Sequence, residues 1–380
     1  MIRLILAILL FLFSLLVAFK APTNLLWRAT VAITEFPYVF MLASILFLVS
    51  CFWADYYKFL SVTLGLIALL LFSSTVFRAY FYSSKITIEN GFPAEGAAMQ
   101  QLEKPFSFTK MFSGIGAGNV TYKTILYTKP SDQKQLAFDY YSANTNQIAP
   151  CVIVIHGGSW AEGDSQQLPA LNSYLANRGY NVASINYRMA PDFKCPAPVE
   201  DTKEVMNYII ANATELKVDT ANFILLGRSA GGQIALLAAY TFHDPRIKGV
   251  ISFYAPADMV WGAQVKGNKW VIDTDKVLSD YIGGLYKDVP GKYKLSSPFE
   301  FVDSTSTPTL IIHGKHDCMV GFQHSVHLKK KLDDYHVKNY FLDLPWATHG
   351  CDYNINGPSG QISTYVIERF INSLTKHTGR

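Results

Sequence analysis

The chain has 380 residues, of which 50% are hydrophobic and only 16% are charged, and its net charge is +4. This composition excludes intrinsic disorder, and the length suffices for one large domain with an appendage. Five basic and two acidic residues give residues 1–82 a charge of +3, so the rest of the chain is almost neutral. That balance excludes the basic surface typical of nucleic-acid-binding domains, and we expect no nucleic-acid partner.

The first 82 residues contain three apolar runs without a charged side chain, at about residues 4–19, 38–54 and 59–77. Each is close to the roughly 17 to 25 residues that a membrane-spanning helix needs. We therefore predict a membrane anchor over residues 1–82 with up to three spans, which is a multi-pass arrangement whose side of the membrane stays open. A cleaved signal peptide is the alternative for the first run, although the following "VAFKAPTN" lacks a small-residue cleavage site.

Residues 83–117 are mixed in composition and only weakly periodic, so we expect a linker or part of a cap with one short helix. Residues 118–380 alternate between short β-branched runs and amphipathic helical patterns. Such alternation is typical of a mostly parallel sheet covered by helices on both faces, which makes the fold class α/β. The strand-like runs are at about residues 120–128, 135–142, 151–156, 181–187, 223–227, 249–255, 309–314 and 339–344. In such sheets, ligands bind beyond the carboxyl ends of the strands.

A G-x-S-x-G motif is formed by Gly227, Ser229 and Gly231, between the strand-like "FILLG" and the helical "AGGQIALLAAY". A serine at such a turn projects its hydroxyl above the sheet, and small neighbours let the strand and the helix approach each other. The motif alone is weak evidence, but this context predicts that Ser229 is a nucleophile. The N–H of Ala230, at the start of the helix, would then face a substrate oxyanion.

A serine nucleophile needs a histidine base and an orienting acid, which should also follow strands. Asp317 follows the run at 309–314, and His349 follows the run at 339–344. We expect His349 to accept the proton of Ser229 while Asp317 keeps the other ring nitrogen protonated. The competing histidines, none of which follows the acid by a strand and a loop, are His313, His316, His324, His327 and His336.

Other roles for these side chains are possible alternatives. A metal site built from His313, His316 and Asp317 would consume the acid that the serine machinery needs, so we expect no metal and no cofactor. Asp343 and Asp352 compete for the role of the acid, but the first lies within a strand-like run and the second follows the histidine.

The segment "VIVIHGGSW" supplies the remaining element of the predicted site. Its two successive glycines follow a strand and let the chain turn, so that backbone N–H groups face the serine. We assign the oxyanion hole to Gly157, Gly158 and Ala230, with the N–H of Ser159 as the alternative.

Five stretches occur in an order known from one enzyme family: "HGGSW", "NYRMAPDFKCPAPVED", "GRSAGG", "IIHGKHD" and "ATHG". From about Lys123 to the C-terminus, the chain resembles an α/β-hydrolase of the acetyl esterase and hormone-sensitive-lipase-like group, and is similar to feruloyl-esterase-like members. The resemblance implies an esterase that forms an acyl-enzyme without a cofactor. The chain departs from the family at "HGGS", where many relatives have a third glycine, and at Arg228, where aspartate or histidine is commoner.

We therefore predict a membrane-anchored serine hydrolase that cleaves small-molecule or lipid esters. The same triad would also serve an amidase or formamidase, an isoprenylcysteine-methylesterase-like enzyme or an acyltransferase. A catalytically silent binding or receptor domain is the non-enzyme alternative. It predicts that one member of the triad is missing, whereas the sequence contains all three. The oligomeric state is left open.

Residues 257–301 interrupt the alternation and predict a cap over the carboxyl ends of the strands. Its aromatic side chains either line a substrate pocket or form the core of the cap itself: Trp261, Trp270, Tyr281 and Tyr286. Cys318 and Cys351 lie beside the acid and the base, whose loops are neighbours in the fold that the resemblance implies. A disulfide between them would indicate an oxidising compartment, but we favour two free thiols because pairing cannot be deduced from sequence.

Overall fold

The computed structural model describes residues 1–53, 56–89, 104–128 and 135–375. Within these residues it shows an eight-stranded sheet in the order β1-β2-β4-β3-β5-β6-β7-β8. The strands are β1 (Lys123–Thr128), β2 (Leu136–Tyr141), β3 (Ala149–Ile155), β4 (Asn181–Ile185), β5 (Val218–Arg228), β6 (Ile247–Phe253), β7 (Thr309–Gly314) and β8 (Asn339–Leu344). β2 pairs antiparallel with β1 and β4, whereas all other pairs are parallel. The predicted eight-stranded, mostly parallel sheet is confirmed.

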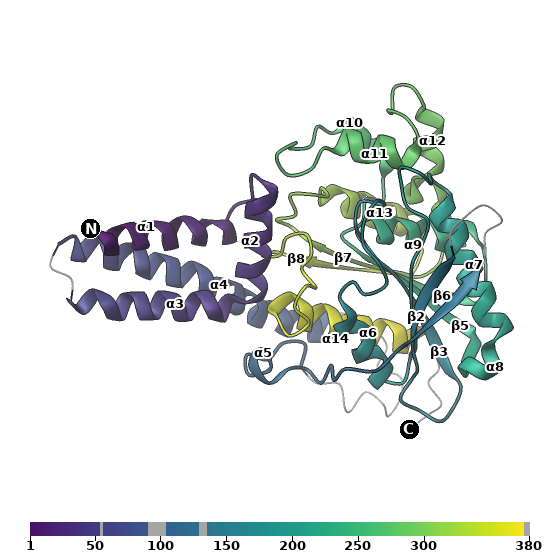
Figure 1. Ribbon diagram of the computed structural model, residues 1–380, viewed down its shortest axis with the longest axis horizontal. Helices are drawn as coiled ribbons and strands as arrows, with labels where there is room; N and C mark the ends of the chain where they lie inside the picture. The colour runs from purple at the N-terminus through teal and green to yellow at the C-terminus, as the bar shows by residue number, and fades with distance from the viewer. Residues whose placement is uncertain (54–55, 90–103, 129–134, 376–380) are drawn as a thin grey trace.

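Helices cover both faces of the sheet (Figure 1). One apolar core joins the sheet to α7 (Ala197–Ala211), α9 (Ala230–Thr241) and α13 (Gln323–Asp334). The second core joins it to α6 (Pro169–Asn177) and α14 (Pro358–Leu374). Because both faces are covered, the central strands must be apolar on both sides, and every residue of β3 is buried. A short helix, α8 (Ala213–Leu216), precedes β5.

Four α-helices lie within the described residues up to residue 89: α1 (Ile2–Ser14), α2 (Asn24–Glu35), α3 (Pro37–Ser50) and α4 (Lys58–Glu89). Helices α1, α3 and α4 lie side by side and project away from the sheet, and α2 lies across their end (Figure 1). Among the described residues, only α4 is by itself long and apolar enough to cross a membrane, over Lys58–Ile86. The pair of α2 and α3, bent by 87°, passes the same test together, and α1 is a shorter apolar helix. By length and composition, this gives weak support for one span, and the predicted multi-pass anchor is not supported by this criterion.

Helix α4 continues past the predicted end at Phe77 and reaches the sheet domain. Its buried residues Val76, Ala79 and Ile86 belong to the same apolar core as α14. The chain therefore stays helical through residues 83–89, where we expected a linker, because this end of α4 has a core to pack against. Residues 90–103 of the predicted linker lie outside the described residues, and a short helix, α5 (Lys110–Ser113), follows them.

The predicted cap contains α10 (Met259–Gln264), α11 (Thr274–Ile282), α12 (Pro290–Leu295) and a 3₁₀ helix at Pro298–Phe301. Tyr281 stacks on Trp160 with the ring centroids 4.3 Å apart, and Tyr286 packs edge-on against Tyr293. The contact of Tyr286 with Tyr293 lies within the cap, as expected for a cap core, whereas the contact of Tyr281 with Trp160 joins the cap to the loop after β3. Trp270 is 79% exposed.

None of the five cysteines, Cys318 and Cys351 included, forms a disulfide in the structure.

Candidate active site

The serine of the G-x-S-x-G motif lies between β5 and α9. Ser229 has a φ of +52° and a ψ of −119°, a sparsely populated conformation that costs about 1 to 3 kcal/mol. The residues two positions before and after Ser229 must be glycines. A Cβ on Gly227 would lie 2.1 Å from the Gly231 carbonyl oxygen. A Cβ on Gly231 would lie 2.2 Å from the carbonyl oxygen of Ile155. The predicted strand, sharp turn and helix are confirmed.

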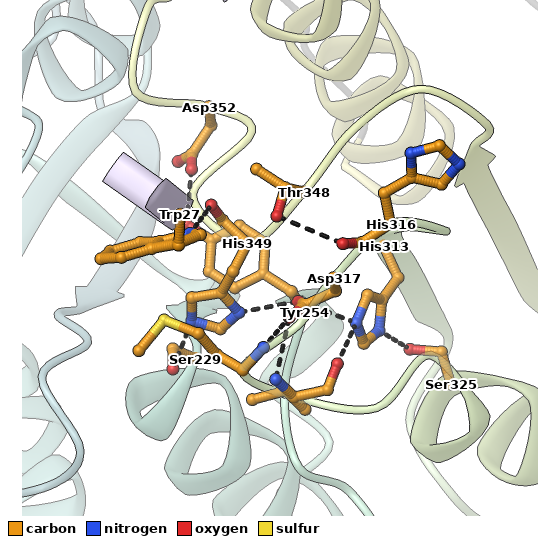
Figure 2. Close-up of polar contacts among 12 residues, drawn as sticks. Trp27, Ser229, Tyr254, His313, His316, Asp317, Ser325, Thr348, His349 and Asp352 are labelled. Atoms are coloured by element: carbon orange, nitrogen blue, oxygen red, sulfur yellow. Dashed lines mark hydrogen bonds and ion pairs between the residues drawn. The ribbon is translucent and has the colours of Figure 1, made fainter. Parts of the chain in front are cut away.

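The three predicted triad side chains form one chain of hydrogen bonds (Figure 2). His349 Nε2 lies 3.0 Å from Ser229 Oγ, and His349 Nδ1 lies 2.7 Å from Asp317 Oδ2. Because Nδ1 faces a carboxylate, it is the nitrogen that carries the proton, and Nε2 is left to accept the Ser229 hydroxyl proton. Asp317 lies in the loop after β7 and His349 in the loop after β8, where the sequence predicted them.

The Asp317 carboxylate accepts four hydrogen bonds. Oδ1 accepts the N–H groups of Met319 and Val320, each at 2.8 Å, and Oδ2 accepts His349 and His313. Burial alone would raise the pKa of Asp317, but the electrostatic attraction and hydrogen bonds of His349 and His313 outweigh burial and hold this pKa well below its usual range. Asp317 is therefore ionised and fixed in orientation.

His313 holds the acid from the side opposite His349. Its Nε2 donates to Asp317 Oδ2 at 3.1 Å and to the Val320 carbonyl at 3.2 Å, and its Nδ1 accepts the Ser325 hydroxyl at 2.7 Å. These contacts fix the orientation of the His313 ring. From the sequence, His313 was only a competing base, and the signal that could have revealed its role is its place at a strand end, four residues before the acid.

Three of the other competing residues have partners away from Ser229. His324 and His327 pack edge-on against Trp261 of the cap, and Asp343 forms an ion pair with Lys315 at 2.5 Å. No group of three metal-ligating side chains occurs within the described part of the chain.

The structure differs from the prediction at Gly157. Its N–H donates to Gln167 Oε1 at 2.7 Å, so this donor is already engaged. The loop nevertheless lies against the nucleophile, because a Cβ on Gly157 would come 3.3 Å from the Ser229 Cβ. Within the described residues, the N–H groups of Gly158, Ser159 and Ala230 have no acceptor, which leaves them as the available donors beside Ser229.

Arg228, which precedes Ser229, is buried and forms an ion pair with a buried carboxylate. Its guanidinium Nε bonds to Asp352, whose Oδ1 accepts the Tyr254 hydroxyl at 2.5 Å. The Tyr254 ring lies 4.4 Å, between centroids, from the ring of His349. Asp352, the second competing acid, is therefore part of the packing behind the base.

A family model described as BD-FAE matches residues 138–332, just over half of the chain. The chain belongs to the BD-FAE family. Two proteins from Mycobacterium tuberculosis are similar to this BD-FAE chain. Esterase LipC is 26% identical over 240 residues, which are 60% of this chain and 59% of LipC. Esterase LipQ is 28% identical over 213 residues, which are 54% of this chain and 51% of LipQ. The chain thus spans between half and three fifths of these relatives.

Solved structures share the fold of this BD-FAE chain. A bacterial heroin esterase matches with a TM-score of 0.60 and 20% identity, covering 70% of this chain and 89% of its own. A hyperthermophilic esterase from Pyrobaculum calidifontis matches with a TM-score of 0.57 and 21% identity, and the match covers 67% of this chain and 86% of that esterase. At identities this low, the matches show the fold alone. That fold is the α/β-hydrolase fold.

Proposed function

We propose that this protein is a membrane-anchored serine hydrolase that cleaves carboxylic esters through an acyl-enzyme. The observation that carries the proposal is the hydrogen-bonded chain from Ser229 through His349 to Asp317, at the carboxyl ends of β5, β8 and β7. The esterases among its relatives and its place in the BD-FAE family support the same activity. We assign catalysis to residues 118–380, with residues 257–301 as the cap.

In the proposed reaction, Ser229 Oγ attacks the ester carbonyl carbon as its proton passes to His349 Nε2. Asp317 stabilises the imidazolium that forms. The N–H groups of Gly158 and Ala230, with Ser159 as a further donor, bind the oxyanion. The imidazolium then gives its proton to the leaving alcohol, and water repeats the sequence on the acyl-enzyme to release the acid and restore Ser229. These steps call for no metal or cofactor.

The proposed anchor rests on the outward faces of α1, α3 and α4. Large apolar side chains are exposed on all three helices, and patches of this kind mark membrane or protein contacts. They include Ile5, Leu9, Leu42, Leu46, Leu66 and Leu70, which are between 46% and 69% exposed. We propose that this bundle enters the bilayer and that the substrate is an ester that resides in the membrane.

The first test uses the full chain purified in detergent. We expect it to hydrolyse p-nitrophenyl esters in a series from acetate to palmitate, and to react with a fluorophosphonate at one site per chain. Mass spectrometry should locate the adduct on Ser229. An inert protein, or an adduct on another residue of a folded protein, would overturn the proposal. The acyl length with the highest kcat/KM separates a small-acyl esterase from a lipase.

The anchor is tested separately by mixing the purified chain with phosphatidylcholine vesicles during removal of the detergent. We expect the protein to float with the vesicles and to remain bound after an alkaline carbonate wash. Release of the protein by the wash would overturn membrane insertion without affecting the esterase proposal.

The Gly158→Ala variant is expected to lose about 10²- to 10³-fold in kcat, the usual cost of removing one oxyanion donor. Gly158 has a φ of +118°, and a Cβ there would lie 2.0 Å from the Glu162 carbonyl oxygen, so the loop must move. Steady-state hydrolysis of p-nitrophenyl acetate measures the loss. Gly116→Ala is the matched control, because Gly116 has a φ of +88° but open space around it. An unchanged kcat in Gly158→Ala would exclude this loop from the oxyanion hole.

A further inference from the structure

The segment of residues 16–35, which we call the junction segment, connects the projecting helices to the loops that carry the proposed acid and base. It contains the end of the first helical stretch and all of α2. From the sequence, these residues belonged to the predicted anchor alone. In the structure they lie directly against the triad, and Figure 2 shows Trp27 beside His349.

The acid loop is held by residues 16–21. Lys20 Nζ donates to the backbone carbonyl of Asp317 at 2.7 Å. The next residue, Cys318, packs into an apolar cluster with Leu16, Val17 and Ala21. The junction segment thus contacts both the backbone of the acid and the side chain that follows it.

The base loop is held by α2 at both ends. Trp27 Nε1 donates to the backbone carbonyl of His349 at 2.9 Å. At the other end of α2, the Glu35 backbone carbonyl accepts Asn354 Nδ2 and its carboxylate accepts the Ser359 hydroxyl, both at 2.8 Å. The chain from His349 to the start of α14 is therefore attached to one helix that lies outside the α/β-hydrolase domain.

The two carbonyls have no other donor within the described residues. Buried carbonyl groups are almost always hydrogen-bonded, and leaving one unpaired costs enough to shift a loop. A displacement of about 1 Å in a catalytic group reduces rates by about 10²-fold. The domain that contains Ser229, His349 and Asp317 thus lacks, by itself and among its described residues, donors for the backbone carbonyls of Asp317 and His349.

We propose that Trp27 and Lys20 are positioning residues of the triad, which hold His349 and Asp317 through their backbone carbonyls. This proposal rests on the proposed function and extends it: the junction segment is required for the chemical step on any ester, whether or not the ester lies in a membrane. Neither residue touches the substrate. Both act by keeping the base and the acid aligned with Ser229.

The test compares Trp27→Phe, which keeps an aromatic ring but removes the donor, and Lys20→Met, which keeps an unbranched side chain but removes the charge and the donor. The substrate is p-nitrophenyl acetate, which is soluble, and the protein is the full chain in detergent. Rates are normalised to the sites that react with a fluorophosphonate. We expect kcat and the rate constant of fluorophosphonate reaction to fall about 10-fold in each variant, with KM unchanged.

Two controls isolate positioning from general damage. Trp53→Phe and Lys58→Met change the same residue types on the projecting helices, where Trp53 is 70% exposed, and should leave kcat unchanged. Lys20→Arg retains a cationic donor and should restore most of the activity lost in Lys20→Met. Thermal unfolding of each variant is followed in parallel.

Equal kcat per reactive site in Trp27→Phe, Lys20→Met and the wild type would overturn the positioning role while the proposed function stands. The positioning role is likewise overturned if the variants lose only reactive sites and thermal stability, because the residues would then be merely structural. A wild-type protein that neither hydrolyses the ester nor reacts with the fluorophosphonate would overturn the proposed function, and this proposal with it.

Discussion

Replacement of Ser229 by alanine is expected to lower kcat for ester hydrolysis by about 10⁶-fold. The hydroxyl is the only atom of this residue that the proposed mechanism uses, and it bonds to His349 Nε2. Alanine keeps the Cβ, so the backbone strain at the φ of +52° is the same as with serine and the sharp turn should be retained. Steady-state hydrolysis and fluorophosphonate reaction should both be lost, while thermal unfolding stays close to that of the wild type.

Ser373→Ala is the matched control for this change. Ser373 lies on α14, and its hydroxyl donates to the Phe370 carbonyl at 2.8 Å, so its removal should leave kcat unaffected. A Ser229→Ala protein that keeps more than about a tenth of the wild-type kcat, far above the loss expected for a nucleophile, would place the nucleophile elsewhere.

Replacement of Asp317 by asparagine is expected to lower kcat by about 10⁴-fold. The carboxylate accepts four hydrogen bonds, and an amide offers only one acceptor oxygen. If that oxygen serves the Met319 and Val320 N–H groups, the amide NH₂ faces His349 Nδ1. His349 must then carry its proton on Nε2, which can no longer accept the Ser229 proton.

The loss in Asp317→Asn should appear in kcat at every pH at which the wild type is active, because the pKa of Asp317 lies well below its usual range and the group stays ionised there. A pH profile of kcat for the wild type and the variant measures this. Asp343→Asn, which alters a competing acid, is expected to retain wild-type kcat. A large loss in Asp343→Asn, together with an active Asp317→Asn protein, would reverse the assignment of the acid.

Much of the fold could be predicted because each element has a local requirement. A parallel strand covered on both faces must be apolar throughout, so the runs around Cys151–Ile155 and Phe223–Gly227 indicated buried strands. The turn at Ser229 needs a glycine two residues before it and two residues after it, and the G-x-S-x-G motif shows this requirement in the sequence. Asp317 and His349 were predicted because each lies in a loop just after a strand, and the structure places both in those loops.

The remaining features depend on contacts between segments far apart in the chain. No local pattern shows that Gln167 occupies the Gly157 N–H or that His313 bonds to Asp317, because both depend on how loops pack after the sheet has formed. The same holds for α2. In the sequence, Lys20 and Glu35 are ionisable residues between apolar runs, and only the folded chain brings Lys20 onto the loop of Asp317 and Glu35 onto the start of α14.

The right-angled bend between α2 and α3 has a consequence for kinetics. With the proposed anchor in a bilayer, α2 lies along the surface and the triad is held directly above it. An enzyme in that position meets its substrate by lateral diffusion, so its rate should follow the number of ester molecules per unit of membrane area and not their bulk concentration. Diluting the ester with inert lipid, at constant total ester, would slow such an enzyme, and a cleaved fatty acid would stay in the leaflet while a water-soluble alcohol departs.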